Sequence, residues 1–200
     1  SSLAPFLRTG SFVALSIIVP CLNEAAGIAA ALEALQPLRA RGAEVLVVDG
    51  GSTDDSARLA LPLADHVLHA RKGRARQMNA GAGRATGDIL LFLHADSLLP
   101  ENADALIAQA LHANRRVWGR FDVRIEGSSM LFRIIAASMN LRSRLTGIAT
   151  GDQAIFVTRS LFEAAGGYED IPLMEDIALS RTLKRYGPPM CLRHRVTTSG

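Results

Sequence analysis

The sequence predicts an α/β fold with a mostly parallel central sheet, flanked by helices and joined to a smaller mixed half. Short continuous apolar runs recur in the first half of the chain, as expected of strands covered on both faces. Segments with apolar residues at helical spacing separate these runs. Strands that alternate with helices imply right-handed crossovers and a parallel sheet. Near Val117 this regular alternation stops, which marks the start of the mixed half.

The first half is expected to contain four strands, each followed by a helix. The strands are expected at Leu15–Val19, Glu44–Asp49, His66–His69 and Ile89–Leu93. The helices are expected at Glu24–Gln36, at Asp54–Leu63 with Ser52 as its cap, from Gly73 onward, and at Asn102–His112. The helix opened by Gly73 is expected to bury one face, which carries Ala75, Met78, Ala82 and Ala85.

The second half is expected to be less regular. Residues Val117–Glu126 partly alternate, as an exposed or antiparallel strand would. The other elements are expected as an amphipathic helix at Met130–Arg144, a strand at Ala154–Thr158, and helices at Arg159–Ala165 and Met174–Tyr186. No repeat, low-complexity tract or linker separates the halves. We therefore assign residues 1–200 to one domain, with halves at about 15–116 and about 117–200.

Composition narrows the class of protein. The 200 residues are 48% hydrophobic and 20% charged, as in a globular domain with a sizeable core. A net charge of +3, 5% aromatic residues and no interleaving of basic with aromatic residues argue against a nucleic-acid surface. Cys21 and Cys191 form neither a disulfide framework nor a metal-ligand spacing. We expect buried free thiols in a reducing compartment, and hence a cytoplasmic protein.

The N-terminal region has features of a signal peptide, because Arg8 precedes an apolar run at residues 12–19. The run continues directly into Pro20 without a small-residue cleavage site, so we interpret it as the first core strand. No apolar run reaches the length of a transmembrane helix.

Acidic residues at three points of the chain suggest a ligand site. Asp49 and Asp96 each end an apolar run, and the carboxyl ends of strands line the crevice of an open α/β sheet. Asp49 precedes two glycines that would let a ligand approach, although Asp also forms turns without any ligand. Asp96 could bind Mg²⁺ or Mn²⁺ together with a diphosphate, with His94 on the same side of the strand. Glu175 and Asp176 begin a helix, where they could complement its dipole or supply a general base.

Arginines provide two further candidate regions. Arg74 ends the cationic segment 71–74 at a helix start, which suits a phosphate but is equally typical of a solvated charge run. Arg133, Arg142 and Arg144 lie on the predicted amphipathic helix. They could contact an anionic acceptor or a membrane surface at the inner face of the membrane, or they could face solvent.

Six motifs occur in an order that resembles the family 2 glycosyltransferases with the GT-A fold. In chain order they are Pro-Cys-Leu-Asn-Glu at 20–24, Val-Val-Asp-Gly-Gly-Ser-Thr-Asp at 47–54, Asn-Ala-Gly at 79–81 with Ala-Thr-Gly-Asp at 85–88, Phe-Leu-His-Ala-Asp at 92–96, Gly-Asp-Gln at 151–153 and Met-Glu-Asp at 174–176. The resemblance covers residues 15–186 and implies a Rossmann-like sheet. It further implies a nucleotide-sugar-binding first half, an acceptor-side second half and an inverting sugar transfer.

The resemblance implies roles on the donor side. Pro20, Leu22 and Glu24 would border the nucleotide pocket, and Asp49 would contact the base. Arg74 is a further candidate for a nucleotide or phosphate contact. The donor would be a UDP-sugar or a GDP-sugar.

It also implies a metal ligand and a catalytic pair. Asp96 matches the last acid of the family's Asp-x-Asp motif and would bind Mn²⁺ or Mg²⁺, while His94 would lie beside the nucleotide. Asp176 matches the second member of the family's Glu-Asp pair and would deprotonate the acceptor hydroxyl, with Glu175 next to it. The acceptor could be a lipid, a saccharide or a small metabolite.

The sequence departs from the family pattern in two motifs. His94 replaces the first acid of Asp-x-Asp, in a Leu-His-Ala-Asp variant similar to that of a small bacterial subgroup, and Gly50 replaces the second acid of Asp-Asp-Gly-Ser. Related proteins often continue past the position of Gly200 into a basic, Trp-containing segment, where part of the acceptor site is expected.

Two other functions are kept as alternatives. A nucleotidyltransferase that makes nucleotide sugars would use a related fold, but no Gly-rich basic loop follows the first strand to hold a triphosphate. A nucleotide-sugar-binding protein without catalysis is suggested by His94 in the metal motif.

Overall fold

The computed structural model describes residues 14–114, 116–127 and 129–199. Its described strands form one eight-stranded sheet in the order β3-β2-β1-β4-β7-β6-β8-β5. The strands are β1 Leu15–Cys21, β2 Glu44–Asp49, β3 His66–His69, β4 Ile89–Phe92, β5 Ser97–Leu98, β6 Trp118–Ile125, β7 Phe156–Thr158 and β8 Met190–Thr198. The helices are α1 Ile28–Glu33, α2 Gln36–Ala40, α3 Ser56–Ala60, α4 Arg74–Arg84, α5 Ala103–Asn114, α6 Met130–Thr146, α7 Arg159–Ala164 and α8 Glu175–Leu183, with a 3-10 turn at Gly151–Gln153. Arg8 and residues 12–13 of the signal-like segment lie outside the described residues.

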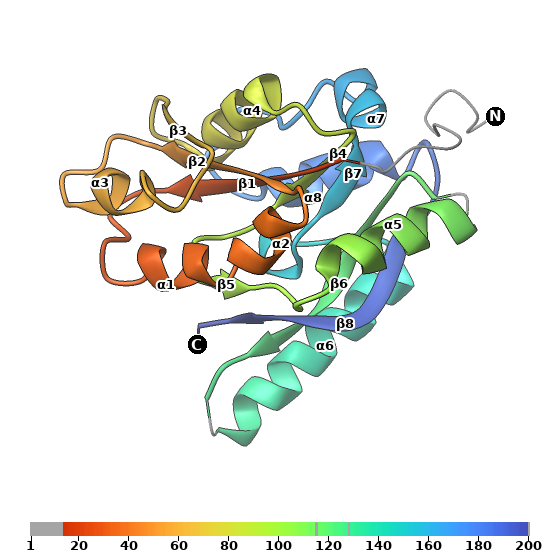
Figure 1. Cartoon of the computed structure of the whole chain (residues 1–200). Helices are drawn as coiled ribbons and strands as arrows, with labels where there is room; N and C mark the ends of the chain where they lie inside the picture. Colours follow the sequence, from red (N-terminus) through yellow and green to blue (C-terminus); the bar gives the residue numbers. More distant parts are fainter. Residues whose placement is uncertain (1–13, 115, 128, 200) are drawn as a thin grey trace.

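The first half forms the predicted parallel sheet. Strand β1 lies between β2 and β4 and is parallel to both, and β3 adds to β2 in the same direction. Alternate β1 residues enter opposite core layers: Ile17 packs in the layer of α1, α2 and α5, and Ile18 packs in the layer of α4, α7 and α8. Figure 1 shows α4 and α7 above the sheet and α1, α2 and α5 below it. Cover on both faces explains why these strands are continuously apolar.

The second half corrects one expectation. Strand β6 is antiparallel to β7, as predicted, but it is parallel to β8, which the sequence did not reveal. The expectation of an exposed strand is wrong, because residues 118–123 are all buried between neighbouring elements. Strand β5 then pairs antiparallel with β8 at the sheet edge.

Helix boundaries also differ from the predictions. The expected helix Glu24–Gln36 is replaced by two short helices, because residues 25–27 form a turn before α1 and residues 34–35 form a turn between α1 and α2. Ser52 does not cap α3, which begins only at Ser56; instead the Ser52 hydroxyl accepts a hydrogen bond from the Asn23 backbone N–H. The predicted buried face of α4 is confirmed, since its residues Ala75, Met78, Ala82 and the following Ala85 are buried.

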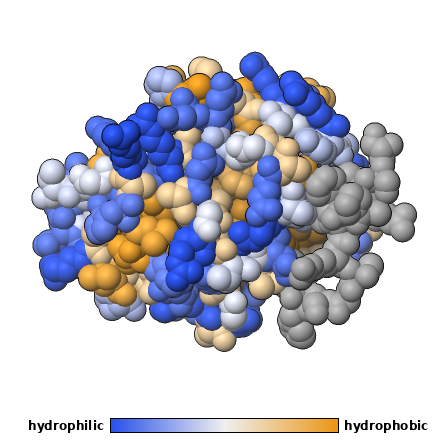
Figure 2. Space-filling view, turned by 90° about the horizontal axis from the view of Figure 1, so that it is seen from above, coloured by the Kyte–Doolittle hydropathy of each residue, from blue (hydrophilic) through white to orange (hydrophobic). Residues whose placement is uncertain are grey.

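The surface is mainly polar on the side of α4 and α7. Seen from that side, hydrophilic side chains surround smaller apolar areas (Figure 2). Among the helices of the described residues, none combines the length and the apolar character needed to cross a bilayer.

Candidate active site

A pocket of about 380 Å³ opens where β1 and β4 end and α4 begins. We call it the strand-end pocket. It brings together six of the nine predicted site residues, which are Pro20, Leu22, Glu24, Arg74, His94 and Asp96. Asp49, Glu175 and Asp176 are not part of its lining. The carboxyl edge of the parallel strands thus forms a concave site, as expected for this class of sheet.

Two loops at this edge are tied together by side chains. Asn23 adopts a left-handed backbone conformation with φ of 56°, and its amide oxygen accepts the Thr53 N–H at 2.9 Å. The Ser56 hydroxyl accepts the Glu24 N–H at 2.7 Å. These bonds join the loop after β1 to the loop after β2, and so they hold Glu24 at the pocket rim.

Helix α4 is anchored to the strand ends by Gln77. Its amide nitrogen donates to the carbonyls of Cys21 and Val48, at 2.9 and 2.8 Å, and the side chain is buried. The amide nitrogen of Gln77 is therefore used in holding the backbone. Arg74 lies at the first position of α4 and is exposed, so its guanidinium is accessible to a ligand in the pocket.

Asp49 is held by its own turn. Its carboxylate accepts hydrogen bonds from the Gly51 and Ser52 N–H groups, each at 3.1 Å, and Nδ1 of His69 lies 3.3 Å away. Burial alone would raise the pKa of Asp49, but the hydrogen bonds from Ser52, Gly51 and His69 outweigh it and lower that pKa. The structure thus contains the turn-forming interactions that the sequence left open as an alternative.

A second group of residues meets around Gly151 and shares His94 and Asp152 with the strand-end pocket. Nδ1 of His94 lies 3.3 Å from Oδ1 of Asp152, and the Gly151 N–H donates to Oδ2 of Asp176 at 2.8 Å. Gly151 lies between the side chains of His94 and Asp176 and leaves little space there. A Cβ at this position would lie 2.5 Å from Cε1 of His94 and 3.0 Å from Oδ2 of Asp176. Two buried atoms of this group have no hydrogen-bond partner within the described part of the chain, namely Nε2 of His94 and Oδ1 of Asp176.

The helix start at Glu175 and Asp176 is unusual. Met174, just before it, has a left-handed conformation with φ of 66°, and no side chain caps the helix. The Asp176 carboxylate bonds the distant Gly151 N–H rather than capping α8. Both acids lie in the first turn of α8, where their charges complement the helix dipole, and Asp176 in addition bonds a distant segment of the chain.

The environment shifts two neighbouring acids in opposite directions. Burial and the charge of Glu175 raise the pKa of Asp176, against the opposing effects of His94, the Gly151 N–H and Arg74. The hydrogen bond with His94 lowers the pKa of Asp152, although burial opposes it. A raised carboxyl pKa makes Asp176 a stronger base, and a lowered one keeps Asp152 ionised.

Asp152 is not among the residues predicted for the site. Its motif Gly-Asp-Gln was part of the resemblance, but only the tertiary structure shows that the carboxylate lines the strand-end pocket next to His94. His94 and Asp152 are far apart along the chain, so no local sequence pattern predicts that they meet.

Asp96 is exposed at the pocket, where Ser199 Oγ donates to its Oδ2 at 2.8 Å. Among the described residues, no group of three or more His, Cys, Asp or Glu is placed to hold a metal ion. The carboxylates of Asp96 and Asp152 still fit Mg²⁺ or Mn²⁺ bound to a diphosphate. Such ions often use one or two carboxylates and take their other ligands from phosphates and water. Asp96 would be the ligand, with the ionised Asp152 across the same pocket.

A smaller cavity of about 240 Å³ adjoins the strand-end pocket and shares Asp96 and Asp152 with it. We call it the inner α6 pocket. Apart from those acids and the chain end at residues 198–199, its lining is apolar and consists of Val123, Ile125, Phe132, Ile135 and Met139. The sequence did not predict it, because it forms only where α6 packs on β6.

Comparisons with known proteins identify the family and support the fold. The family model described as Glycosyl transferase family 2 matches residues 16–159. The PGL/p-HBAD biosynthesis glycosyltransferase of Mycobacterium tuberculosis is 33% identical over 165 residues, which cover 76% of this chain and 62% of that protein.

Solved structures share the fold. S. aureus TarS in complex with UDP-GlcNAc superposes with a TM-score of 0.75 at 16% identity, over 94% of this chain and 58% of that chain. Mannosyltransferase PcManGT from Pyrobaculum calidifontis, in complex with GDP-Man and Mn²⁺, superposes with a TM-score of 0.69 at 23% identity, over 99% and 62%. The predicted GT-A fold is confirmed, and the chain spans less than two thirds of the length of each of these proteins.

Proposed function

This chain belongs to the family 2 glycosyltransferases, and from that premise we propose that it transfers a sugar from a nucleotide-diphosphate sugar to an acceptor hydroxyl with inversion at the anomeric carbon. The observation that carries the proposal is the Asp176 carboxylate. One of its oxygens is bonded to Gly151, and the other is buried, has no partner in the described part of the chain, and lies in a group that continues through His94 to the strand-end pocket.

The donor is assigned to the strand-end pocket. Pro20, Leu22 and Glu24 border the nucleotide, and Arg74 contacts a phosphate oxygen. The Asp49 carboxylate contacts the base in addition to the Gly51 and Ser52 N–H groups that it already accepts. TarS binds UDP-GlcNAc and PcManGT binds GDP-Man, so relatives of this fold use both bases and the donor is a UDP-sugar or a GDP-sugar.

The acceptor is assigned to the side of the inner α6 pocket. Its hydroxyl oxygen attacks the anomeric carbon from the face opposite the diphosphate, its proton passes to Asp176, and the bond from the anomeric carbon to the diphosphate oxygen breaks. Glu175 maintains the proton affinity of Asp176 through its charge. Arg74 and the N-terminus of α4 face the charge that develops on the departing nucleoside diphosphate.

A divalent cation completes the proposed donor site. Mn²⁺ or Mg²⁺ would be held by Asp96 and would neutralise charge on the leaving diphosphate. The solved structure of PcManGT is a complex with GDP-Man and Mn²⁺, which supports a cation of this class. His94 would remain beside the donor, oriented by Asp152.

Asp176→Asn tests the base assignment. We expect the variant to keep the melting shift produced by a nucleoside diphosphate with Mn²⁺, and to lose sugar transfer and donor hydrolysis. Glu163→Gln is the matched control, because it removes an exposed carboxyl outside both pockets and should keep both properties. Unchanged turnover in Asp176→Asn would refute the assignment.

The same assays separate the alternatives. Release of pyrophosphate from a nucleoside triphosphate and a sugar phosphate would replace the proposal with a nucleotidyltransferase. Tight donor binding without transfer or hydrolysis, in the parent as well as in Asp176→Asn, would identify a binding protein.

A further inference from the structure

Helix α6 is packed the opposite way from an ordinary surface helix. Its buried side consists of small or polar residues, Ala136, Asn140 and Ser143. Asn140 bonds both the N–H and the carbonyl of Val123, at 2.9 and 3.0 Å, and the fully buried Arg120 donates to Ser143 Oγ at 3.0 Å. The helix is therefore attached to β6 through hydrogen bonds, and several of its large apolar residues are left on the outside.

Six of the ten exposed large apolar side chains in the described part of the chain lie on α6. Four of them, which we call the outer face of α6, are between 58% and 78% exposed: Met130, Ile134, Leu141 and Leu145. Their spacing of four, seven and four residues places them in one stripe. The stripe spans about 22 Å along the helix axis. Figure 1 shows α6 at the edge of the molecule, away from α4 and α7.

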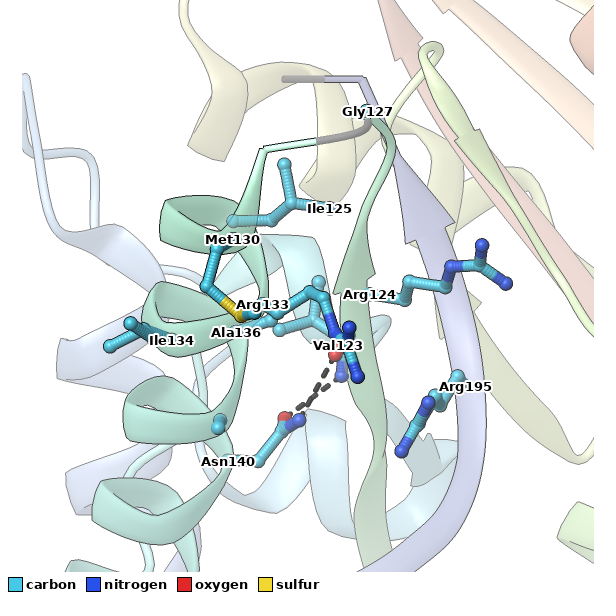
Figure 3. Close-up of a pocket in the computed structure, with 11 residues that line it drawn as sticks. Val123, Arg124, Ile125, Gly127, Met130, Arg133, Ile134, Ala136, Asn140 and Arg195 are labelled. Carbon is cyan, nitrogen blue, oxygen red and sulfur yellow. Dashed lines mark hydrogen bonds between the residues drawn. The ribbon is translucent and has the colours of Figure 1, made fainter.

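Arginines border the outer face. Beside it lies a cavity of about 770 Å³, here called the arginine pocket, which is lined by Arg124 of β6, Arg133 of α6 and Arg195 of β8. Its lining contains no carboxylate, and these three arginines have no ion pair among residues 14–114, 116–127 and 129–199. In Figure 3, Arg133 extends from α6 toward β6, and Arg195 lies across from it on β8. Guanidinium groups without an ion-pair partner can bind a phosphate, and the apolar residues of the same cavity can contact an apolar chain attached to it.

We propose that the outer face of α6 docks on an anionic membrane surface, with lipid phosphates accepted at the arginine pocket. Large apolar residues on one side and arginines at the borders are the features of a helix that lies in the bilayer interface. Anionic lipid matches both the outer face of α6 and the arginine pocket, because an apolar partner alone would leave the arginines without an anion. The inner α6 pocket lies on the other side of the same helix, so docking would hold the site close to the lipid surface.

Vesicle co-sedimentation tests the proposal without any need for enzymatic activity. The probes are vesicles of phosphatidylcholine alone and vesicles that also contain phosphatidylglycerol. We expect binding to the anionic vesicles that weakens with added salt and is much weaker on neutral vesicles. Ile134→Ser with Leu141→Ser should reduce the binding constant roughly tenfold or more, because two anchoring side chains are lost. Arg133→Gln and Arg195→Gln should each reduce it about fivefold on anionic vesicles only.

Leu61→Ser is the matched control. Leu61 is 63% exposed but lies beyond α3, far along the chain from α6, so its loss should leave vesicle binding unchanged. Equal loss of binding in the Leu61 and α6 variants, or no binding of the parent to anionic vesicles, would overturn the proposal. A concentration-dependent dimer that Ile134→Ser and Leu141→Ser abolish would also overturn it, because a second copy would then cover the outer face.

Discussion

Gly151→Ala is the sharpest test of the proposed site, because Gly151 lies between His94 and Asp176. The new methyl carbon would lie 2.5 Å from Cε1 of His94, nearer still to Nε2, and 3.0 Å from Oδ2 of Asp176. Carbon atoms do not approach other heavy atoms so closely, so at least one of the two side chains must move. Gly151 has no left-handed conformation, so the effect comes from this contact and not from backbone strain.

The size of the effect follows from the crowding. Overpacking of a close-packed site costs about 1–3 kcal/mol. In a domain of this size each kcal/mol lowers Tm by about 2–4 °C, so we expect a decrease of roughly 2–12 °C. Displacement of the base by about 1 Å can cost about 100-fold in rate, which is the decrease expected in kcat.

The assay combines thermal melting with sugar transfer or donor hydrolysis. Gly83→Ala is the control, because an added Cβ at this exposed position in α4 meets nothing within 4 Å. It should stabilise the helix by up to about 1 kcal/mol and leave the rate unchanged. A Gly151→Ala variant with the melting point and rate of the parent would refute the close packing of His94 against Asp176.

Three further predictions follow from other contacts. Asp176→Asn is expected to raise Tm at neutral pH, because burial and Glu175 raise the pKa of Asp176 and so penalise its ionised form. This penalty is present above the raised pKa of the folded state and disappears as the pH falls below the ordinary carboxyl pKa, so the gain should vanish in acid. A gain that is equal at neutral and acidic pH would contradict this cause. Asp96→Ala should remove the Mn²⁺-dependent part of the melting shift given by UDP or GDP, and an undiminished shift would exclude Asp96 as the metal ligand. Asn79→Ala should lower the free energy of unfolding by about 2 kcal/mol, because the Asn79 amide bonds both the N–H and the carbonyl of Tyr168, at 2.9 and 2.8 Å. Urea unfolding measures this loss, and a change below about 0.5 kcal/mol would mean that solvent replaces both bonds.

Local patterns of the sequence were sufficient for most of the first half. The apolar runs of β1, β2 and β4 are continuous because helices cover both faces of the sheet, and this burial is visible in the residues themselves. The placement of Asp96 and Arg74 at one pocket follows in the same way, because the ends of parallel strands and the starts of their helices share one edge.

Tertiary structure alone decided which way α6 faces. The sequence predicts an amphipathic helix over this segment, and such a pattern ordinarily places the apolar stripe on the core. The buried Arg120, which donates to Ser143, requires a polar helix side against β6, and this requirement comes from a residue on another element. A pattern within one helix carries no information about the polarity of the surface that it will meet.

The sequence by itself thus determined the fold class, the parallel first half and six of the residues that line the strand-end pocket. The tertiary structure decided the pairing of β6 with β8, the meeting of His94, Asp152 and Asp176, and the outward apolar face of α6. One physical reason explains why the sequence determined the first set of features and not the second. Periodicity reports whether a residue is buried, whereas contacts between segments distant along the chain depend on how the elements pack together.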